Sequence, residues 1–402
     1  MPKTKNQKPK TTIDFANLQY QYKLYKDEID TAIHTVLDKS NYIMGDEVKE
    51  LEENLQTFTG ARHAITCSSG TDALLLAMMA LDIQPGDEII TTPFTFIATA
   101  ETIAFLGAVP VFVDIDEKTY NIDPSKIEDV ITEKTKAIMP VSLYGQPADM
   151  DAIQAVVDKE EGRRQKAEEE KKKKNPSSFS PLPSTSKIKI IIDGAQSFGS
   201  TYKGKTDSNL GDISTTSFFP AKPLGCFGDG GAVFTNDDAL AEKMKSLRVH
   251  GQSKRYHHKY IGMGGRMDTL QCAIVNVKLK HYAKDLALRQ EIASNYTSAL
   301  EKKDLIVPFV HSNITSAWAQ YSVRVPNRDN VQAKLKEQGI PTAVHYPMPL
   351  HMQECFAYLG YNKGDFPLCE QVSNEIMSLP MNPYVMDEEI AYISDKIIQC
   401  LN

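Results

Sequence analysis

The sequence predicts an α/β protein with a large N-terminal domain and a smaller C-terminal α+β domain. The chain has 402 residues, which is long for a single hydrophobic core. Between residues 64 and 192, short apolar segments alternate with helical patterns, as is typical of a mainly parallel sheet covered on both faces. We expect a disordered tail at 1–12, the large domain at 13–252 and the small domain at 253–402.

The large domain follows this alternation along the chain. Charged and apolar residues at helical spacing predict helices at Tyr22–Lys39 and Asp46–Gly60. Strands are expected at Ala64–Cys67, Glu88–Thr92, Val109–Asp114, Ala137–Leu143 and Lys187–Ile192, with helices between them at Ala73–Leu81, Phe96–Leu106, Asp123–Ile131 and Asp149–Val157. Two more β-prone runs start at Ser214 and at Gly231, and they flank Lys222.

Residues 158–187 interrupt the pattern with a Glu/Lys/Arg run followed by a Pro/Ser-rich run. Such a composition does not bury enough apolar surface to fold alone, so we interpret it as a surface insertion that is helical in part. A tolerated loop expansion is favoured over an interaction tail. Beyond a long helix from Thr269, the small domain is expected to contain a strand at Gln320–Val325, a helix at Asn330–Gln338, a strand at Pro341–His345 and a final helix at Asp387–Leu401.

Composition excludes several functions. A net charge of -7 argues against a nucleic-acid partner, which requires a concentrated basic face. The longest apolar run, Ile103–Val113, is too short to span a membrane, and the Lys-rich N-terminus lacks the apolar core of a signal peptide. The six cysteines form no C-x-x-C pair and His257 and His258 are adjacent, so we expect no metal site and a cytoplasmic location.

A small-residue turn, Ser68–Asp72, joins the first strand to a helix. Free N–H groups and the helix dipole make such a turn suitable for a phosphate, although Ser, Thr and Asp are also ordinary helix N-caps. Ligands of parallel sheets lie beyond the carboxyl ends of the strands, and this rule assigns Thr71, Phe96 and Tyr144 to one cleft.

Two charged residues complete the candidate site. Pro223 disfavours helix at Lys222, which therefore lies in a loop between two strands, where an amine is suited to imine chemistry or is simply solvated. Asp193, at the tip of a buried strand, requires a positive partner unless it is only an N-cap. A phosphate turn, an aromatic residue, a buried acid and a loop lysine together form the set that pyridoxal phosphate (PLP) requires.

The motifs at Ser69–Leu74, Thr95–Phe96, Asp193–Gln196, Ser217–Gly225, Gly228–Gly231 and Arg266–Gln271 resemble those of the DegT/StrS-like sugar-nucleotide aminotransferases of PLP fold type I. The resemblance implies a mainly parallel seven-stranded sheet between helices, and a homodimer with shared active sites. It also implies that Lys222 forms the Schiff base and moves the proton, and that Asp193 binds the pyridine nitrogen. Gln196 is expected to contact the ring hydroxyl and Phe96 to cover the ring, while Gly70, Thr71 and Ser217 hold the phosphate. An Asn that family members contribute from the partner subunit is replaced here by Gly264.

Within that family, the segments Pro140–Gln146, His250–Gln252, Arg255–His258, Thr342–Pro347 and Met377–Pro380 resemble one subgroup. This subgroup aminates C3 of UDP-2-acetamido-2-deoxy-3-oxo-glucuronic acid with L-glutamate for O-antigen (lipopolysaccharide) synthesis. Arg266, His345 and Tyr346 are then expected to meet the UDP-sugar or its carboxylate, although His345 and Tyr346 are also consistent with packing at a strand end. The alternatives are a 4-keto-sugar aminotransferase, a PLP-dependent sugar dehydratase and a non-enzymatic regulator of the same fold. Such dehydratases carry His in place of Lys222.

Overall fold

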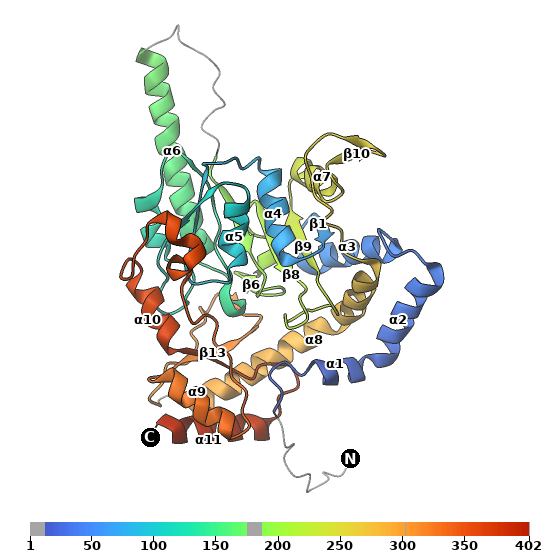
Figure 1. Cartoon of the computed structure of the whole chain (residues 1–402), viewed down its shortest axis with the longest axis vertical. Coiled ribbons are helices and arrows are strands. Elements are labelled where there is room, and N and C mark those ends of the chain that lie inside the picture. Colours follow the sequence, from blue (N-terminus) through green and yellow to red (C-terminus); the bar gives the residue numbers. More distant parts are fainter. Residues whose placement is uncertain (1–12, 175–186, 302, 402) are drawn as a thin grey trace.

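The central feature of the fold is a seven-stranded sheet (Figure 1). The computed structural model describes residues 13–174, 187–301 and 303–401. The strand order is β1-β9-β8-β5-β4-β2-β3. Strand β9 is antiparallel to both of its neighbours, and the remaining pairs are parallel. The strands are β1 His63–Cys67, β2 Glu88–Thr91, β3 Val109–Phe112, β4 Thr135–Ile138, β5 Lys189–Asp193, β8 Ile213–Ser217 and β9 Gly231–Thr235.

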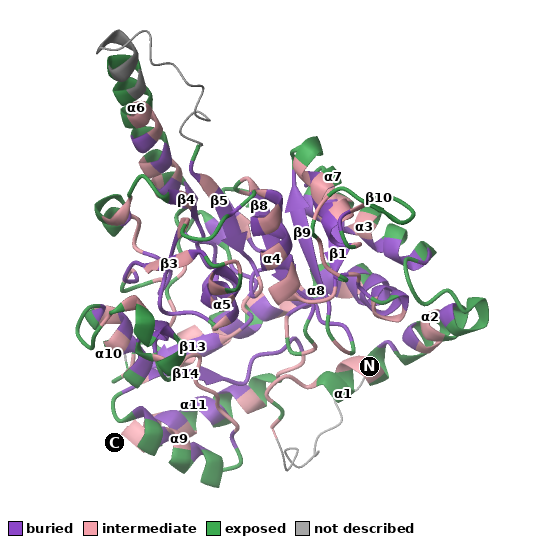
Figure 2. Ribbon diagram, turned by 45° about the horizontal axis from the view of Figure 1, so that its top comes forward, coloured by how far each residue is buried: buried purple, intermediate pink, exposed green. Residues whose placement is uncertain are grey.

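Helices cover both faces of this sheet, because alternate side chains of each strand point to opposite sides. Ile89, Ile191 and Val233 face one side, where they pack with helices α4 Gly70–Ala80, α5 Ala98–Phe105 and α7 Asp238–Leu247. On the other side, Ile90 and Ile190 pack on α6 Met150–Lys174, and strands β1 and β9 pack on α3 Asp46–Thr59 and α8 Thr269–Leu300. The sheet is therefore buried on both faces, as its colouring in Figure 2 shows.

The C-terminal part has its own core, which includes Ile292, Tyr296, Val323 and Ile393. Its antiparallel pair is β13 Tyr321–Arg324 with β14 Ile376–Leu379. Helices α9 Arg328–Glu337, α10 Pro367–Glu375 and α11 Asp387–Leu401 and the second half of α8 surround this pair (Figure 1). The remaining helices, α1 Leu18–Leu24 and α2 Lys26–Lys39, precede α3. Small pairings link β6 Thr201–Tyr202 with β7 Lys205–Thr206 and β12 Ile314–Thr315, and β10 Gln252–Lys254 with β11 His257–His258.

Three predicted elements differ in the structure. The helix expected at Asp123–Ile131 is two 3-10 turns, Pro124–Lys126 and Glu128–Val130, with the fully buried Ile127 between them. The strand expected at Pro341–His345 is absent, apart from one bridge between Ala343 and Ser378. The helix expected to end at Val157 continues to Lys174 and projects from the body of the molecule (Figure 1).

The first part of the predicted insertion is thus helical and anchored. The buried carboxylate of Glu160 pairs with Arg163 and Arg164, and Arg164 also donates to the carbonyl oxygen of Thr132 at 2.8 Å. The rest of the insertion, at 175–186, and the predicted tail at 1–12 lie outside the described residues. The domain boundary at residue 253 stays a prediction. Among the described helices, none is both long and apolar enough to cross a bilayer.

Candidate active site

Asp193 ends strand β5, and its buried carboxyl group is held by two donors. The Thr99 hydroxyl donates to Oδ2 at 2.7 Å, and the Ala195 N–H donates to Oδ1 at 3.2 Å. Burial raises the pKa of Asp193, and these two hydrogen bonds and the charge of Lys222 oppose that shift. Within the described chain, no cation is bonded to this carboxyl group. It therefore fits a cationic partner brought by a ligand, such as a protonated pyridine nitrogen.

Lys222 lies in the loop that connects the neighbouring antiparallel strands β8 and β9. The loop is closed by the N–H of Phe218, which donates to the Gly230 carbonyl at 2.7 Å, and by the N–H of Cys226, which donates to the Phe218 carbonyl at 2.7 Å. The Lys222 amine makes no hydrogen bond to a described residue. Burial lowers the pKa of Lys222, an effect that the charge of Asp193 partly offsets. A lysine with a lowered pKa is the form suited to Schiff-base and proton-transfer chemistry.

The predicted phosphate turn begins α4. The Ser69 side chain caps this helix by accepting the N–H of Asp72 at 3.0 Å. A Cβ added at Gly70 would lie 2.7 Å from the Cβ of Ser217, and one added at Gly231 would lie 2.5 Å from the carbonyl oxygen of Ser69. Both positions therefore require glycine, and the first N–H groups of α4 are left uncovered beside the Ser217 hydroxyl, which is a cradle that fits a phosphate.

The turn and Asp193 lie at the same edge of the sheet. Strand pairing places Asp193 opposite Thr215, and Ser217 follows two residues later at the end of β8. Gly70 packs against Ser217 from α4. The structure thus brings together Asp193, Lys222, Ser217 and the Ser69–Thr71 turn, as expected from the carboxyl ends of neighbouring parallel strands.

Aromatic and amide side chains form another wall. Gln196 accepts the N–H of Tyr144 at 2.8 Å and donates to the Tyr346 hydroxyl at 3.0 Å. The rings of Phe96 and Tyr346 lie 6.2 Å apart at 39°, and Phe96 is 55% exposed. The exposed face of Phe96 leaves room for a planar ligand, while the stacking predicted for this residue stays a prediction.

His345 is held beside this wall, with its Nδ1 2.9 Å from the Ser378 hydroxyl. Burial lowers the pKa of His345 to about 4, and the charge of Lys222 acts in the same direction, so the imidazole is neutral at physiological pH. Arg266 follows Gly265, whose carbonyl accepts the N–H of Ser68 at 3.0 Å, and its side chain has no ion pair or hydrogen bond among the described residues. The backbone next to Arg266 therefore lies beside the phosphate turn, and no hydrogen bond or ion pair links Arg266 to His345 or Tyr346.

Residues that the sequence did not indicate also support the site. Thr99, from α5, holds Asp193. Lys278, buried on α8, donates to the Gly225 carbonyl in the Lys222 loop at 2.7 Å and lies 4.5 Å from the centre of the Phe227 ring. Burial lowers the pKa of Lys278 to about 8. A lysine inside a helical pattern carries no signal that it is buried or that it faces a distant loop.

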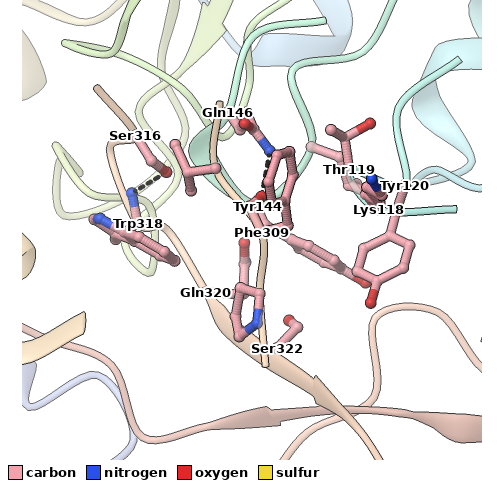
Figure 3. Close-up of a pocket in the computed structure, with 13 residues that line it drawn as sticks. Lys118, Thr119, Tyr120, Tyr144, Gln146, Phe309, Ser316, Trp318, Gln320 and Ser322 are labelled. Carbon is pink, nitrogen blue, oxygen red and sulfur yellow. Dashed lines mark hydrogen bonds between the residues drawn. The ribbon is translucent and has the colours of Figure 1, made fainter. Parts of the chain in front are cut away.

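A small cavity lies beside Tyr144, between residues 118–120, 143–146 and 308–322 (Figure 3). Its volume of about 20 Å³ is enough for one water molecule. The Gln320 Oε1 atom in its wall is buried and has no hydrogen-bond partner among the described residues. This space is too small for a substrate.

The pattern of strands, turn, acid and lysine matches a known family. A model of the DegT/DnrJ/EryC1/StrS aminotransferase family matches residues 23–161 and 177–398. The chain belongs to this family. Being an aminotransferase of this family, it is a PLP enzyme, and the predictions of family, fold type, enzyme class and cofactor are confirmed. The unmatched residues 162–176 of the aminotransferase fall within the predicted insertion.

Similar proteins support this assignment along almost the whole aminotransferase chain. The UDP-2-acetamido-2-deoxy-3-oxo-D-glucuronate aminotransferase of Pseudomonas aeruginosa is 48% identical over 95% of this chain and 98% of its own length. A pleiotropic regulatory protein of Geobacillus stearothermophilus is 44% identical over 96% of this chain and 98% of its own length. The crystal structure of Streptomyces venezuelae DesV with a ketimine intermediate superimposes with a TM-score of 0.88 at 32% identity, and covers 96% of this chain and 98% of DesV.

Proposed function

We propose that this aminotransferase moves an amino group from L-glutamate to C3 of UDP-2-acetamido-2-deoxy-3-oxo-glucuronic acid, in the synthesis of a surface polysaccharide such as O-antigen. The observation that carries the proposal is the 48% identity to the P. aeruginosa enzyme named for this substrate, over 95% of the chain. The unpaired guanidinium of Arg266 supports it, because this group binds carboxylates and phosphates through two parallel hydrogen bonds. His345 and Tyr346 are proposed to contact the sugar.

Each residue of the site has a distinct role in the proposed reaction. When bound, PLP carries the amino group and stabilises negative charge on the carbon that loses its proton. Lys222 holds the cofactor at rest and, once released, moves the proton as a neutral amine, a state that burial favours. Asp193, held by Thr99 and Ala195, keeps the ring nitrogen protonated. Gln196 orients the ring, and Gly70, Thr71 and Ser217 hold the phosphate.

The test is turnover of the PLP-loaded protein with L-glutamate and the 3-oxo UDP-sugar, followed as 2-oxoglutarate formed. A 4-oxo sugar nucleotide is the control acceptor, and Lys222→Ala is the control variant. In Lys222→Ala we expect no turnover and no yellow colour of the lysine-bound cofactor. Preference for the 4-oxo sugar would favour the 4-keto-sugar aminotransferase. A product without new nitrogen would favour the dehydratase, and a colour unchanged by glutamate would favour the regulator.

We infer that the protein is a homodimer with shared active sites. Large apolar side chains near the site are exposed in the single chain, among them Phe96, Phe219, Phe227, Ile43 and Met44. Such a concentration is typical of a surface that another protein covers. If Arg266 serves the partner's site, co-expressed Lys222→Ala and Arg266→Ala chains recover about one quarter of wild-type activity, because half of the dimers then contain one intact site. No recovery would show that Arg266 does not act in the partner's site.

A reducing compartment is also proposed, as expected for the cytoplasm. The cysteines are all free, and Cys355 is exposed. Free exposed thiols are typical of proteins that are kept reduced. We expect all six cysteines of freshly isolated, denatured protein to react with a thiol reagent. A persistent disulfide would contradict this location.

A further inference from the structure

A second buried carboxyl group, that of Asp207, lies beneath the active site. Asp207 begins a 3-10 turn, Asp207–Asn209, which precedes β8 by three residues. Its side chain is 1% exposed, and it forms no ion pair among the described residues. Oδ1 accepts the Ser142 hydroxyl at 3.0 Å, and Oδ2 accepts the Ser197 hydroxyl. None of the functions assigned above uses this carboxyl group.

The two serines belong to the two segments that build the cofactor site. Ser142 follows β4, donates its N–H to the Asp193 carbonyl at 3.0 Å, and precedes Tyr144 by two residues. Ser197 immediately follows Gln196, whose amide is held by Tyr144. Asp207 therefore connects the segment after β4 to the segment after β5 by side-chain hydrogen bonds.

The packing around Gly194 shows how close Asp207 is to these segments. A Cβ added at Gly194 would lie 3.0 Å from Oδ2 of Asp207 and 2.6 Å from the Thr215 carbonyl oxygen. The carboxyl group thus lies directly against the peptide that follows Asp193. A displacement of Asp207 would shift the backbone that carries Asp193.

We propose that Asp207 is a positioning residue for the cofactor: through Ser142 and Ser197 it joins the segments after β4 and β5 and fixes Asp193 and Gln196 relative to each other. The proposal rests on the proposed function only in that the cofactor meets Asp193 and Gln196. The charge of Asp207 gives this role a measurable signature, as follows from its surroundings.

Among the described residues, Asp193 is the ionisable group whose charge affects the pKa of Asp207. Burial raises the pKa of Asp207 to about 6, the charge of Asp193 adds to this shift, and the two serine hydroxyls oppose it. Around neutral pH, Asp207 therefore adds a negative charge near Asp193. Removing that charge lowers the pKa of acids nearby, since like charges disfavour ionisation.

The experiment compares Asp207→Asn and Ser197→Ala with a matched control, Ser200→Ala. The Ser200 hydroxyl is buried in the same loop and has no hydrogen-bond partner among the described residues. PLP is titrated into each apoprotein, the visible absorbance of the loaded protein is followed against pH, and the melting temperature of each apoprotein is recorded.

Asp207→Asn and Ser197→Ala are expected to weaken PLP binding about tenfold, the value of one lost buried hydrogen bond to a charged group. In Asp207→Asn, the absorbance titration also moves to lower pH. Ser200→Ala is expected to behave like the wild type in both measurements. If both variants bind PLP as tightly as Ser200→Ala, or lose only melting temperature, Asp207 has no positioning role. Because no sugar substrate is used, this result is independent of the proposed acceptor.

Discussion

Burial favours the neutral form of both Lys222 and Asp193, although it shifts their pKa values in opposite directions. It lowers the pKa of Lys222 and raises that of Asp193, and each charge partly restores the ionised form of the other. Asp193 nevertheless functions as an anion in the proposed chemistry, which its hydrogen-bond donors favour together with the charge of Lys222. The hydrogen bond donated by the Thr99 hydroxyl is the shorter of the two, at 2.7 Å.

Thr99→Val is therefore expected to reduce PLP affinity and turnover about tenfold, because at nearly constant volume it removes the buried hydrogen bond to Asp193, together with the one to the Thr95 hydroxyl. Thr102→Val is the matched control. Its hydroxyl is buried on the same helix and donates to the Ala98 carbonyl at 2.8 Å, away from Asp193. Equal losses in the two variants would show that the helix, and not the bond to Asp193, is responsible.

His345 predicts a pH dependence of stability. Its pKa is about 4 in the folded protein and 6.5 when unperturbed, so the unfolded chain binds the proton first as the pH falls. The free energy of unfolding therefore falls from about pH 6.5 downward and levels off near pH 4. The loss between pH 7.5 and pH 5 is about 2 kcal/mol. Denaturant unfolding of apo His345→Gln should lack this component, and exposed His34→Gln should retain it. An unchanged pH profile in His345→Gln would contradict the burial effect.

At the scale of elements, helix α8 supports the loop that carries Lys222. Lys278 holds the Gly225 carbonyl, and the Gln271 side chain accepts the N–H of Phe227 at 2.8 Å. The loop is also crowded at Gly225, where an added Cβ would lie 2.5 Å from the Pro220 carbonyl oxygen. The conformation of the loop thus depends on a helix that is distant in sequence.

Lys278→Met is expected to destabilise the protein by about 1–3 kcal/mol, because the buried Gly225 carbonyl loses its donor. The Lys222 loop should also react with PLP more slowly, which is measured as the rate at which the yellow colour appears. Lys280→Met, on the exposed side of the same helix, is the control and should change neither quantity. If the two variants behave alike, Lys278 does not support the loop.

Local patterns in the sequence predicted the central sheet well. Runs such as Ile190–Ile192 are β-branched and buried on both faces, so composition and burial agree. The rule for the carboxyl ends of strands assigned Thr71, Phe96 and Tyr144 to one cleft, and the structure has Asp193 and the Ser69 turn at that same edge of the sheet. Thr99, Lys278 and Asp207 could not be predicted, since each acts on a segment far away in sequence. The Pro341–His345 segment reads as a strand, but contacts such as the Tyr144 hydroxyl donating to the His345 carbonyl hold it outside regular pairing.

At the scale of the whole molecule, the projecting half of α6 is separate from the site. Its anchored portion ends near Arg164, and the family match omits residues 162–176. Replacing residues 166–186 with a short Gly/Ser linker is therefore expected to leave kcat/KM within about twofold of the wild-type value, because surface insertions tolerate length changes. Steady-state kinetics and the melting temperature measure the outcome. A loss of activity at unchanged melting temperature would assign this segment a catalytic or substrate-binding role.

Helix α8 belongs to both cores of the molecule. Its first half packs Cys272, Val275 and Leu279 under the sheet, and its second half packs Ile292 and Tyr296 in the C-terminal part. At 32 residues it is about 48 Å long, and it contains no Gly or Pro at which it could bend. The C-terminal core and the Lys222 loop therefore both rest on one continuous helix, through Ile292 and Tyr296 at one end and Lys278 nearer the other.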